Sequence, residues 1–258
     1  KQEYNEVDGM HLTSATYEYI LSYIQRYITE APEAEASSKA AGTLTPAVTT
    51  APEDTSVPEE TTSSEPEQSE PESTGLSESY DQEFFANDLF IGDSIAVGLS
   101  DYAKLDPSNV AASVSLTPYK AHAEAITLGD GSSGTALSYA EKMQPQRIFL
   151  MLGFNGLSSP NAMQGSFRDL MVKLEEACPD SVIYCCSITP LTADSSAAAS
   201  AGFGNDNVRS FNEYLKTLSS ELGVIYLDLN THMSDDSGCL KQEYNEVDGM
   251  HLTSATYE

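Results

Sequence analysis

The chain has 258 residues, of which 40% are hydrophobic, and a formal net charge of −28 at pH 7. This length and composition suffice for one sizeable hydrophobic core. So acidic a chain is not expected to bind nucleic acid, whose phosphates require Lys and Arg, or an anionic membrane surface. No apolar run approaches the length that spans a bilayer, and the residues after Lys1 do not resemble a signal peptide, so we expect no membrane insertion.

The chain begins with a segment that it repeats near its other end. Residues 1–18 recur without change as residues 241–258. Each copy carries the motif Asp-x-x-His, once as Asp8/His11 and once as Asp248/His251. The sequence leaves open whether the duplication is a window of a tandem array, a rearrangement, or one segment present at both ends.

The first copy continues into a stretch with helical periodicity. Apolar residues recur at positions 17, 20, 21, 24, 27 and 28 and form one face of an amphipathic helix within the N-terminal segment, residues 1–28. The second copy reaches Glu258 before the equivalent stretch. We therefore expect the C-terminal domain to take its closing helix from the first copy, in the same chain or by segment exchange with a second copy of the chain.

Residues 29–80 are mainly Thr, Ser, Pro, Glu and Ala and have the composition of a disordered acidic linker. A flexible coil of about 50 residues spans roughly 40 Å, so residues 1–28 can reach their own domain or a neighbouring molecule. Linkers of this composition often tether exported domains to a cell surface. We expect an extracytoplasmic location, secreted or surface-tethered, and a cytoplasmic interdomain linker is the alternative.

Residues 81–258 alternate short apolar runs with helical patterns. Strands are expected at 89–91, 109–116, 147–152, 181–188 and 224–229, and helices at 95–103, 135–143, 162–177 and 208–222. This alternation predicts an α/β domain, a three-layer flavodoxin-like sandwich with a five-stranded parallel sheet. Ligands bind such sheets beyond the carboxyl ends of the strands, where two motifs fall.

The first motif, Gly-Asp-Ser, ends the first strand and places Ser94 at a helix N-terminus, where a hydroxyl is either a cap or a nucleophile. The second, Gly-Phe-Asn-Gly, places Asn155 after the third strand, where ordinary turn chemistry is the alternative reading. The third is Asp-x-x-His. Asp248 could instead cap a following helix.

Ser, Gly-x-Asn and Asp-x-x-His in this order resemble the SGNH (GDSL-type) hydrolase family over about residues 87–258. The resemblance implies that Ser94 is the nucleophile, His251 the base and Asp248 its orienting acid. It also implies an oxyanion hole made of the Ser94 backbone N–H, the Asn155 amide and the Ser115 backbone N–H. Asp8 and His11 are the duplicate alternative, and proximity to the last strand favours the second copy.

Two departures from the family pattern bear on activity. Gly156 stands where the family has an Asp after the oxyanion Asn. For the Gly that the family has after the second strand, Ser115 is the better counterpart and Gly129-Asp130-Gly131 the weaker one. A catalytically impaired binding domain on an acidic stalk is therefore the competing prediction. A flavodoxin-like nucleotide-binding domain is a weaker one, because Gly-Asp-Ser is a poor phosphate loop.

The resemblance predicts a serine esterase that acts on short acyl esters, notably acetyl esters of a carbohydrate. A lysophospholipase or thioesterase would use the same groups but need a larger apolar trough than Phe154 and Leu157 suggest. We expect no metal ion and no organic cofactor. The four cysteines are predicted to be free thiols, and His122 and His232 to be surface or loop residues.

Overall fold

The computed structural model describes Leu12, residues 14–30, 80–102 and 104–193, Ser195, residues 202–241 and Tyr244. Both Asp-x-x-His motifs lie outside these residues, and so does the predicted linker from position 31 to position 79. Within the described part of the chain, no helix combines the length and the apolarity needed to span a membrane.

A five-stranded parallel sheet forms the centre of the molecule, as the sequence predicts. Its strands are β1 (Asp88–Gly92), β2 (Val110–Ala112), β5 (Arg147–Met151), β6 (Val182–Cys186) and β7 (Ile225–Leu227). The spatial order is β2-β1-β5-β6-β7, and every pairing is parallel. Every residue of β1 and β5 is buried, which explains why both strands are apolar without alternation after a charged first residue, Asp88 in β1 and Arg147 in β5.

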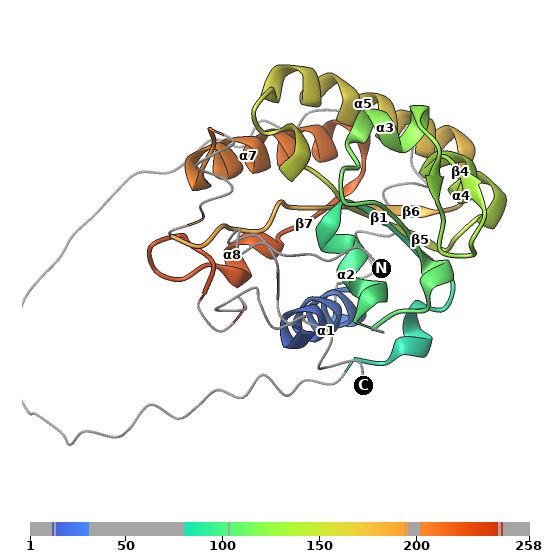
Figure 1. Cartoon of the computed structure of the whole chain (residues 1–258), viewed down its shortest axis with the longest axis horizontal. Helices are drawn as coiled ribbons and strands as arrows, with labels where there is room; N and C mark the ends of the chain where they lie inside the picture. The colour runs from blue at the N-terminus through green and yellow to red at the C-terminus, as the bar shows by residue number, and fades with distance from the viewer. Residues whose placement is uncertain are drawn as a thin grey trace, which may run out of the picture.

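Helices cover both faces of this sheet (Figure 1). The helices are α1 (Ser14–Glu30), α2 (Ser94–Asp101), α3 (Pro118–Ala123), α4 (Ala136–Met143), α5 (Pro160–Ala177), α7 (Asn205–Leu222) and α8 (Leu229–Met233). Figure 1 shows α1 and α2 on one side of the sheet and α3, α5 and α7 on the other. The predicted three-layer α/β architecture is confirmed.

Aromatic packing joins the three central strands. The rings of Phe90 and Phe149 stack at 4.6 Å between centroids, and those of Phe149 and Tyr184 stack at 4.9 Å. At the amino edge of the sheet, the Arg147 guanidinium pairs with the buried carboxylate of Asp88 at 2.8 Å. The carboxyl edge, where the sequence motifs lie, carries a different set of polar groups.

The predicted second strand is too long at both ends. Asn109 lies in a 3-10 turn, and its side-chain amide donates to the backbone carbonyls of Phe85, Ala86 and Asp88. The strand ends at Ala112 because the next residues form a turn, in which the Leu116 N–H donates to the Ser113 carbonyl at 2.8 Å. The apolar residues in this turn, Val114 and Leu116, continue the pattern of the strand, which is why the sequence predicts a longer strand.

Three short elements were not predicted: α3, α8 and a hairpin of β3 (Ile126–Thr127) with β4 (Ser133–Gly134). They have two to six residues each, too few to show a hydrophobic period. The start of α3 has a recognisable signal, since Thr117 caps the Lys120 N–H and Pro118 follows it.

The prediction of free thiols is confirmed for all four cysteines. Cys178, Cys185 and Cys186 are buried and Cys239 is partly exposed.

Candidate active site

Ser94 is the first residue of α2 and follows directly from the end of β1. The first N–H groups of a helix have no intrahelical acceptor, so this end is rich in free donors. The chain order of the strands reverses between β1 and β5, which makes this crevice the switch point at which parallel α/β sheets bind ligands. Ser94 is half-buried and so remains accessible from solvent.

Asp93 joins the loop after β1 to the loop after β5. One carboxylate oxygen accepts the Ile95 N–H at 3.2 Å and caps α2, and the other accepts the Gly153 N–H, also at 3.2 Å. In the opposite direction, the Asp93 N–H donates to the Met151 carbonyl at 3.1 Å. Burial raises the pKa of the Asp93 carboxyl to about 6, against the lowering effect of these backbone donors.

Asn155 lies in a 3-10 turn, Phe154–Gly156, directly after β5. The turn depends on Gly153, whose φ of 147° lies in a region that L side chains rarely adopt. A Cβ atom on Gly153 would also lie 2.3 Å from the Ile188 side chain. The glycine before Asn155 is therefore required by backbone conformation and by packing.

The Asn155 side chain binds the turn after β2. Its amide nitrogen donates to the Val114 carbonyl at 2.9 Å and to the Leu116 carbonyl at 3.2 Å, which bracket Ser115. The same turn is tied to β1, since the Ser113 N–H donates to the Gly92 carbonyl at 3.2 Å. The structure thus brings the loops of Ser94, Asn155 and Ser115 together at one edge of the sheet, and both amide hydrogens of Asn155 are used within the protein.

Gly156 has no space for the carboxylate that the family pattern places there. A Cβ atom at this position would lie 2.2 Å from the sulfur of Met163 on α5. Met163 is buried, so a thioether fills the volume beside the Asn155 turn. The two residues are seven positions apart in the sequence, so this exchange of a carboxylate for a thioether is visible only in the fold.

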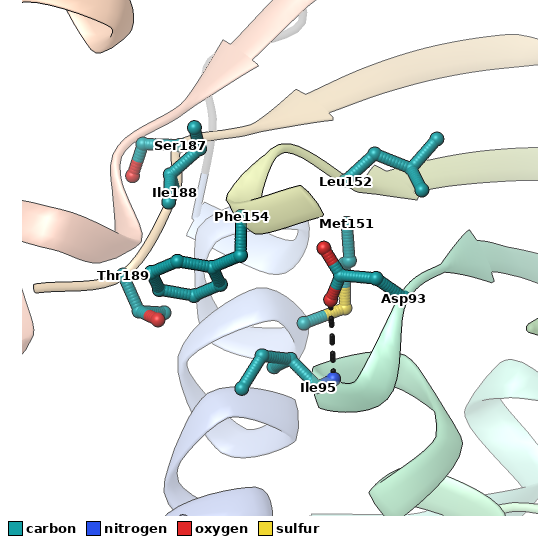
Figure 2. Close-up of a pocket in the computed structure, with 8 residues that line it drawn as sticks. All are labelled: Asp93, Ile95, Met151, Leu152, Phe154, Ser187, Ile188 and Thr189. Atoms are coloured by element: carbon teal, nitrogen blue, oxygen red, sulfur yellow. Dashed lines mark hydrogen bonds between the residues drawn. The ribbon is translucent and has the colours of Figure 1, made fainter. Parts of the chain in front are cut away.

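A small cavity lies at the same edge, lined by Asp93 and Ile95, the two neighbours of Ser94 in the chain (Figure 2). Its lining combines one carboxylate and two hydroxyls with apolar side chains, from Asp93, Ile95, Met151, Leu152, Phe154, Ser187, Ile188 and Thr189. The cavity has room for about one water molecule. The contribution of Ser187 and Thr189, which follow β6, was not foreseen from the sequence.

The two candidate bases, His11 and His251, lie outside the described residues, and so do their orienting acids, Asp8 and Asp248. Their positions relative to Ser94 stay a prediction. His232 lies on α8 and packs against Tyr23 of α1, with ring centroids 4.4 Å apart. His122 lies on α3, where burial is the main factor that lowers its pKa. Among the residues that the structure describes, no three His, Cys, Asp or Glu side chains are grouped as a metal site would require.

Two of the described residues expose large apolar side chains. They are Val114, 39% exposed, in the turn bound by Asn155, and Tyr119, 56% exposed, at the start of α3. Val114 thus adds an exposed apolar side chain next to the loop of Asn155.

A parallel α/β sheet with a serine at its switch point, braced to an Asn-bearing loop, defines the class of the protein as an SGNH-type α/β acylhydrolase fold. The model of the GDSL-like lipase/acylhydrolase family matches residues 90–258, which is more than half of the chain. The chain therefore belongs to the GDSL-like lipase/acylhydrolase (SGNH) family.

Comparisons with individual proteins give more distant similarities. A search of curated proteins gives no match. Similar solved structures include a GDSL-like lipase from Bacteroides thetaiotaomicron, with 14% identity and a TM-score of 0.45 over 66% of this chain and 80% of that one. The periplasmic domain of a Salmonella ser. Paratyphi A lipopolysaccharide acetyltransferase has 18% identity and a TM-score of 0.42 over 60% and 70%. A carbohydrate esterase family 3 protein from Talaromyces cellulolyticus has 13% identity and a TM-score of 0.38 over 59% and 86%.

Proposed function

We propose that the protein is a serine esterase that hydrolyses short-chain acyl esters, with acetyl esters preferred. Membership of the acylhydrolase family supports the reaction class. The observation that carries the proposal is the bracing of Ser94 to the Asn155 loop through Asp93, which accepts N–H groups from both sides. A nucleophile and an oxyanion donor must be held in fixed relation, and this carboxylate is buried between them.

In the proposed reaction, Ser94 Oγ attacks the ester carbonyl carbon while the histidine of one Asp-x-x-His copy takes the hydroxyl proton. The carbonyl oxygen becomes an oxyanion, which accepts hydrogen bonds from the Ser94 N–H and the Asn155 amide. The bond to the alcohol then breaks, and the histidine returns the proton to the leaving oxygen. Water attacks the acyl-enzyme by the same route, and the products are a carboxylic acid and a free serine.

The oxyanion role asks Asn155 to release one of its present acceptors. The bond to the Leu116 carbonyl, at 3.2 Å, is the longer and weaker of the two and is therefore the one to be released. We propose that this hydrogen turns to the oxyanion while the bond to Val114 continues to hold the turn. The Leu116 carbonyl, which lies in a part-buried bond, would then need a water molecule as its new partner.

The small cavity supports a short acyl group. It has room for about one water molecule, and its lining includes Ile95, Phe154 and Ile188. A long fatty acyl chain would need an apolar trough, which a lysophospholipase or thioesterase must provide. For the alcohol side we propose a carbohydrate hydroxyl, which the family resemblance implies, with the exposed ring of Tyr119 as the stacking surface.

The test compares p-nitrophenyl acetate, butyrate and octanoate as substrates of the unaltered chain and of Ser94→Ala. We expect acetate to be turned over fastest, and Ser94→Ala to lose about 10⁴-fold or more in kcat. The control is Ser100→Ala, further along α2, whose hydroxyl donates only to the Val97 carbonyl. Turnover of acetylated xylo-oligosaccharides compared with acetylated glycerol tests the alcohol side of the ester, and we expect the carbohydrate ester to be hydrolysed faster. A folded chain that turns over none of these esters would overturn the proposal.

One observation favours a second candidate, a catalytically impaired member that binds esters or glycans without turning them over. Both amide hydrogens of Asn155 are engaged by carbonyls, and Gly156 lacks the family carboxylate. A fluorophosphonate probe separates the two candidates, because it labels only an activated serine. Labelling at Ser94, located by peptide mass, supports the esterase, and a folded unlabelled chain supports the binding domain.

A further inference from the structure

Helix α1 comes from the N-terminal end of the chain but contacts the far end directly. The Thr16 hydroxyl donates to the Tyr244 carbonyl at 2.8 Å, and these residues are 228 positions apart. The ring of Tyr19 also stacks on the ring of Tyr244, with centroids 5.0 Å apart. Two contacts, one polar and one aromatic, therefore fix the start of α1 beside the chain that follows α8.

These contacts join the two copies of the repeat. Tyr244 belongs to the second copy, whereas Thr16 and Tyr19 belong to the first copy and its helix. Tyr244 corresponds to Tyr4 of the first copy, so in a single copy the equivalent of Tyr244 comes before the equivalent of Thr16. Among the described residues, the structure thus places the beginning of one copy, from the C-terminal end of the chain, against the end of the other copy, from the N-terminal end.

The place that α1 fills lies within the core. Leu12 is 1% exposed, and the buried face of α1 carries Tyr17, Ile20, Leu21 and Ile24. Tyr17 packs onto Gly98 of α2, where even a Cβ atom would lie 2.1 Å from its ring. The first copy and the helix that follows it fill this closely fitted place.

This place adjoins the candidate nucleophile. Gly98 lies one helical turn after Ser94, so Tyr17 anchors the first turn of α1 beside the first turns of α2. His11 directly precedes Leu12 in the chain, whereas the last described residue of the second copy, Tyr244, lies seven positions before His251. The histidine attached to the docked helix is therefore the one in the first copy.

We propose that the first copy completes the domain, and that His11 with Asp8, not His251 with Asp248, is the base that serves Ser94. The assignment of the base rests on the proposed esterase function, while the completion of the fold does not. It reverses the preference drawn from the sequence, where proximity to the last strand favoured the second copy. Proximity along the chain is outweighed by the packing of α1, which the sequence does not display.

The duplication supplies matched controls, because every substitution in one copy has an identical twin in the other. Leu12→Asp places a carboxylate in the core and is expected to lower Tm by about 10 °C or more, and Leu252→Asp by less than about 2 °C. Thr16→Val removes the bond to Tyr244 and should lower Tm by about 3 °C, with no shift for Thr256→Val. This milder pair decides the question if Leu12→Asp does not fold. Equal shifts within a pair, or larger shifts in the second copy, would overturn the proposal.

The same logic applies to activity. His11→Ala is expected to reduce turnover of p-nitrophenyl acetate by about 10³-fold or more, while His251→Ala, which the proposal leaves outside the machinery, keeps the rate of the unaltered chain. Loss on His251→Ala would overturn the assignment. So would retention by both single variants with loss in the double variant, since either copy would then serve.

The two proposals fail in different ways. If the unaltered chain folds but neither hydrolyses esters nor reacts with a fluorophosphonate, the esterase function falls, and the base assignment with it. The Tm pairs still decide which copy completes the fold. If Ser94 reacts and Ser94→Ala is inactive, yet the Leu12 and Leu252 variants behave alike, the function stands and the assignment of the copies fails.

Discussion

Asp93 is a buried carboxylate that binds two loops, and its ionisation should be visible in stability. Its pKa is about 6 in the folded protein and near 3.8 in the unfolded chain, so the folded state holds its proton to higher pH. The unfolded state therefore binds fewer protons between these values, and the stabilisation present below pH 4 is lost as pH rises through 6. Because of this group, the free energy of unfolding should fall by about 2 kcal/mol from pH 4 to pH 7.

The measurement is urea unfolding at pH 4, 5, 6 and 7 for the unaltered chain and for Asp93→Asn. The amide does not titrate, so the difference in stability between the two proteins should change by about 2 kcal/mol across this range. Asp180→Asn, at an exposed turn before β6, is the matched substitution measured beside it. A pH-independent difference for Asp93→Asn would show that its carboxyl is not perturbed.

Asn155 offers a second prediction at this scale. Removing its amide deletes two hydrogen bonds to the turn of Ser115 and the proposed oxyanion donor. Because the side chain is exposed, Asn155→Ala should cost no more than about 2 kcal/mol of stability. It should lower kcat by about 10²- to 10³-fold, since the loss falls on the transition state. Steady-state kinetics beside urea unfolding makes the comparison, with exposed Ser158→Ala as the control. An unchanged kcat would remove Asn155 from the proposed machinery.

Between elements, the contact of α1 with α2 depends on a glycine. Alanine is the better helix former by about 1 kcal/mol, so Gly→Ala inside a helix is stabilising where space allows. At Gly98 the added methyl would lie 2.1 Å from Tyr17, which is buried and stacked on Tyr102 at 5.2 Å. Gly98→Ala should therefore destabilise the protein by about 1–3 kcal/mol.

Gly165 on α5 provides the matched control. It is exposed, and no atom lies within 4 Å of its added Cβ, so Gly165→Ala should stabilise by up to about 1 kcal/mol. Thermal or urea unfolding of the two variants gives opposite signs if α1 docks on α2 as described. A stabilising Gly98→Ala would mean that Tyr17 does not occupy this contact in solution.

The main elements could be predicted because their signals are local. The runs at 147–152 and 181–188 and the αL cap at Gly223 are read directly from neighbouring residues. The bracing of the site could not be predicted, because it depends on contacts between distant positions: Asn155 with Val114, and Gly156 with Met163. Ser94 and Asn155 were placed correctly at strand ends, whereas the selection of one repeat copy depends on how α1 packs.

For the whole molecule, the chain leaves α1 at Glu30 and returns beside the same helix. The Asp81 N–H donates to the Gln25 side chain at 2.7 Å, and the Tyr80 hydroxyl donates to the Lys104 carbonyl at 2.6 Å. Lys104 in turn pairs with Glu18 of α1. The segment between positions 31 and 79 thus closes a loop whose two ends lie on one side of α1.

Loop closure of this kind depends weakly on length. Halving a flexible loop lowers its closure entropy cost by only about 0.6 kcal/mol. Deleting residues 45–68 leaves about 25 residues, which extend to about 80 Å, far beyond the few turns of α1 to be bridged. We expect this deletion to raise the unfolding free energy by about 0.6 kcal/mol and to leave the state of association of the protein unchanged.

Urea unfolding and size-exclusion chromatography at two protein concentrations measure both effects. The control is an insertion of a Gly/Ser segment of 49 residues between positions 56 and 57, which should lower stability by a similar amount because it doubles the loop. A loss of more than about 2 kcal/mol on deletion would show that the segment makes contacts of its own, since chain entropy alone has the opposite sign. A shift to a dimer would show that α1 docks on a neighbouring molecule once the loop is shortened. If α1 docks within its own chain, the deletion should leave the state of association unchanged and raise the stability slightly.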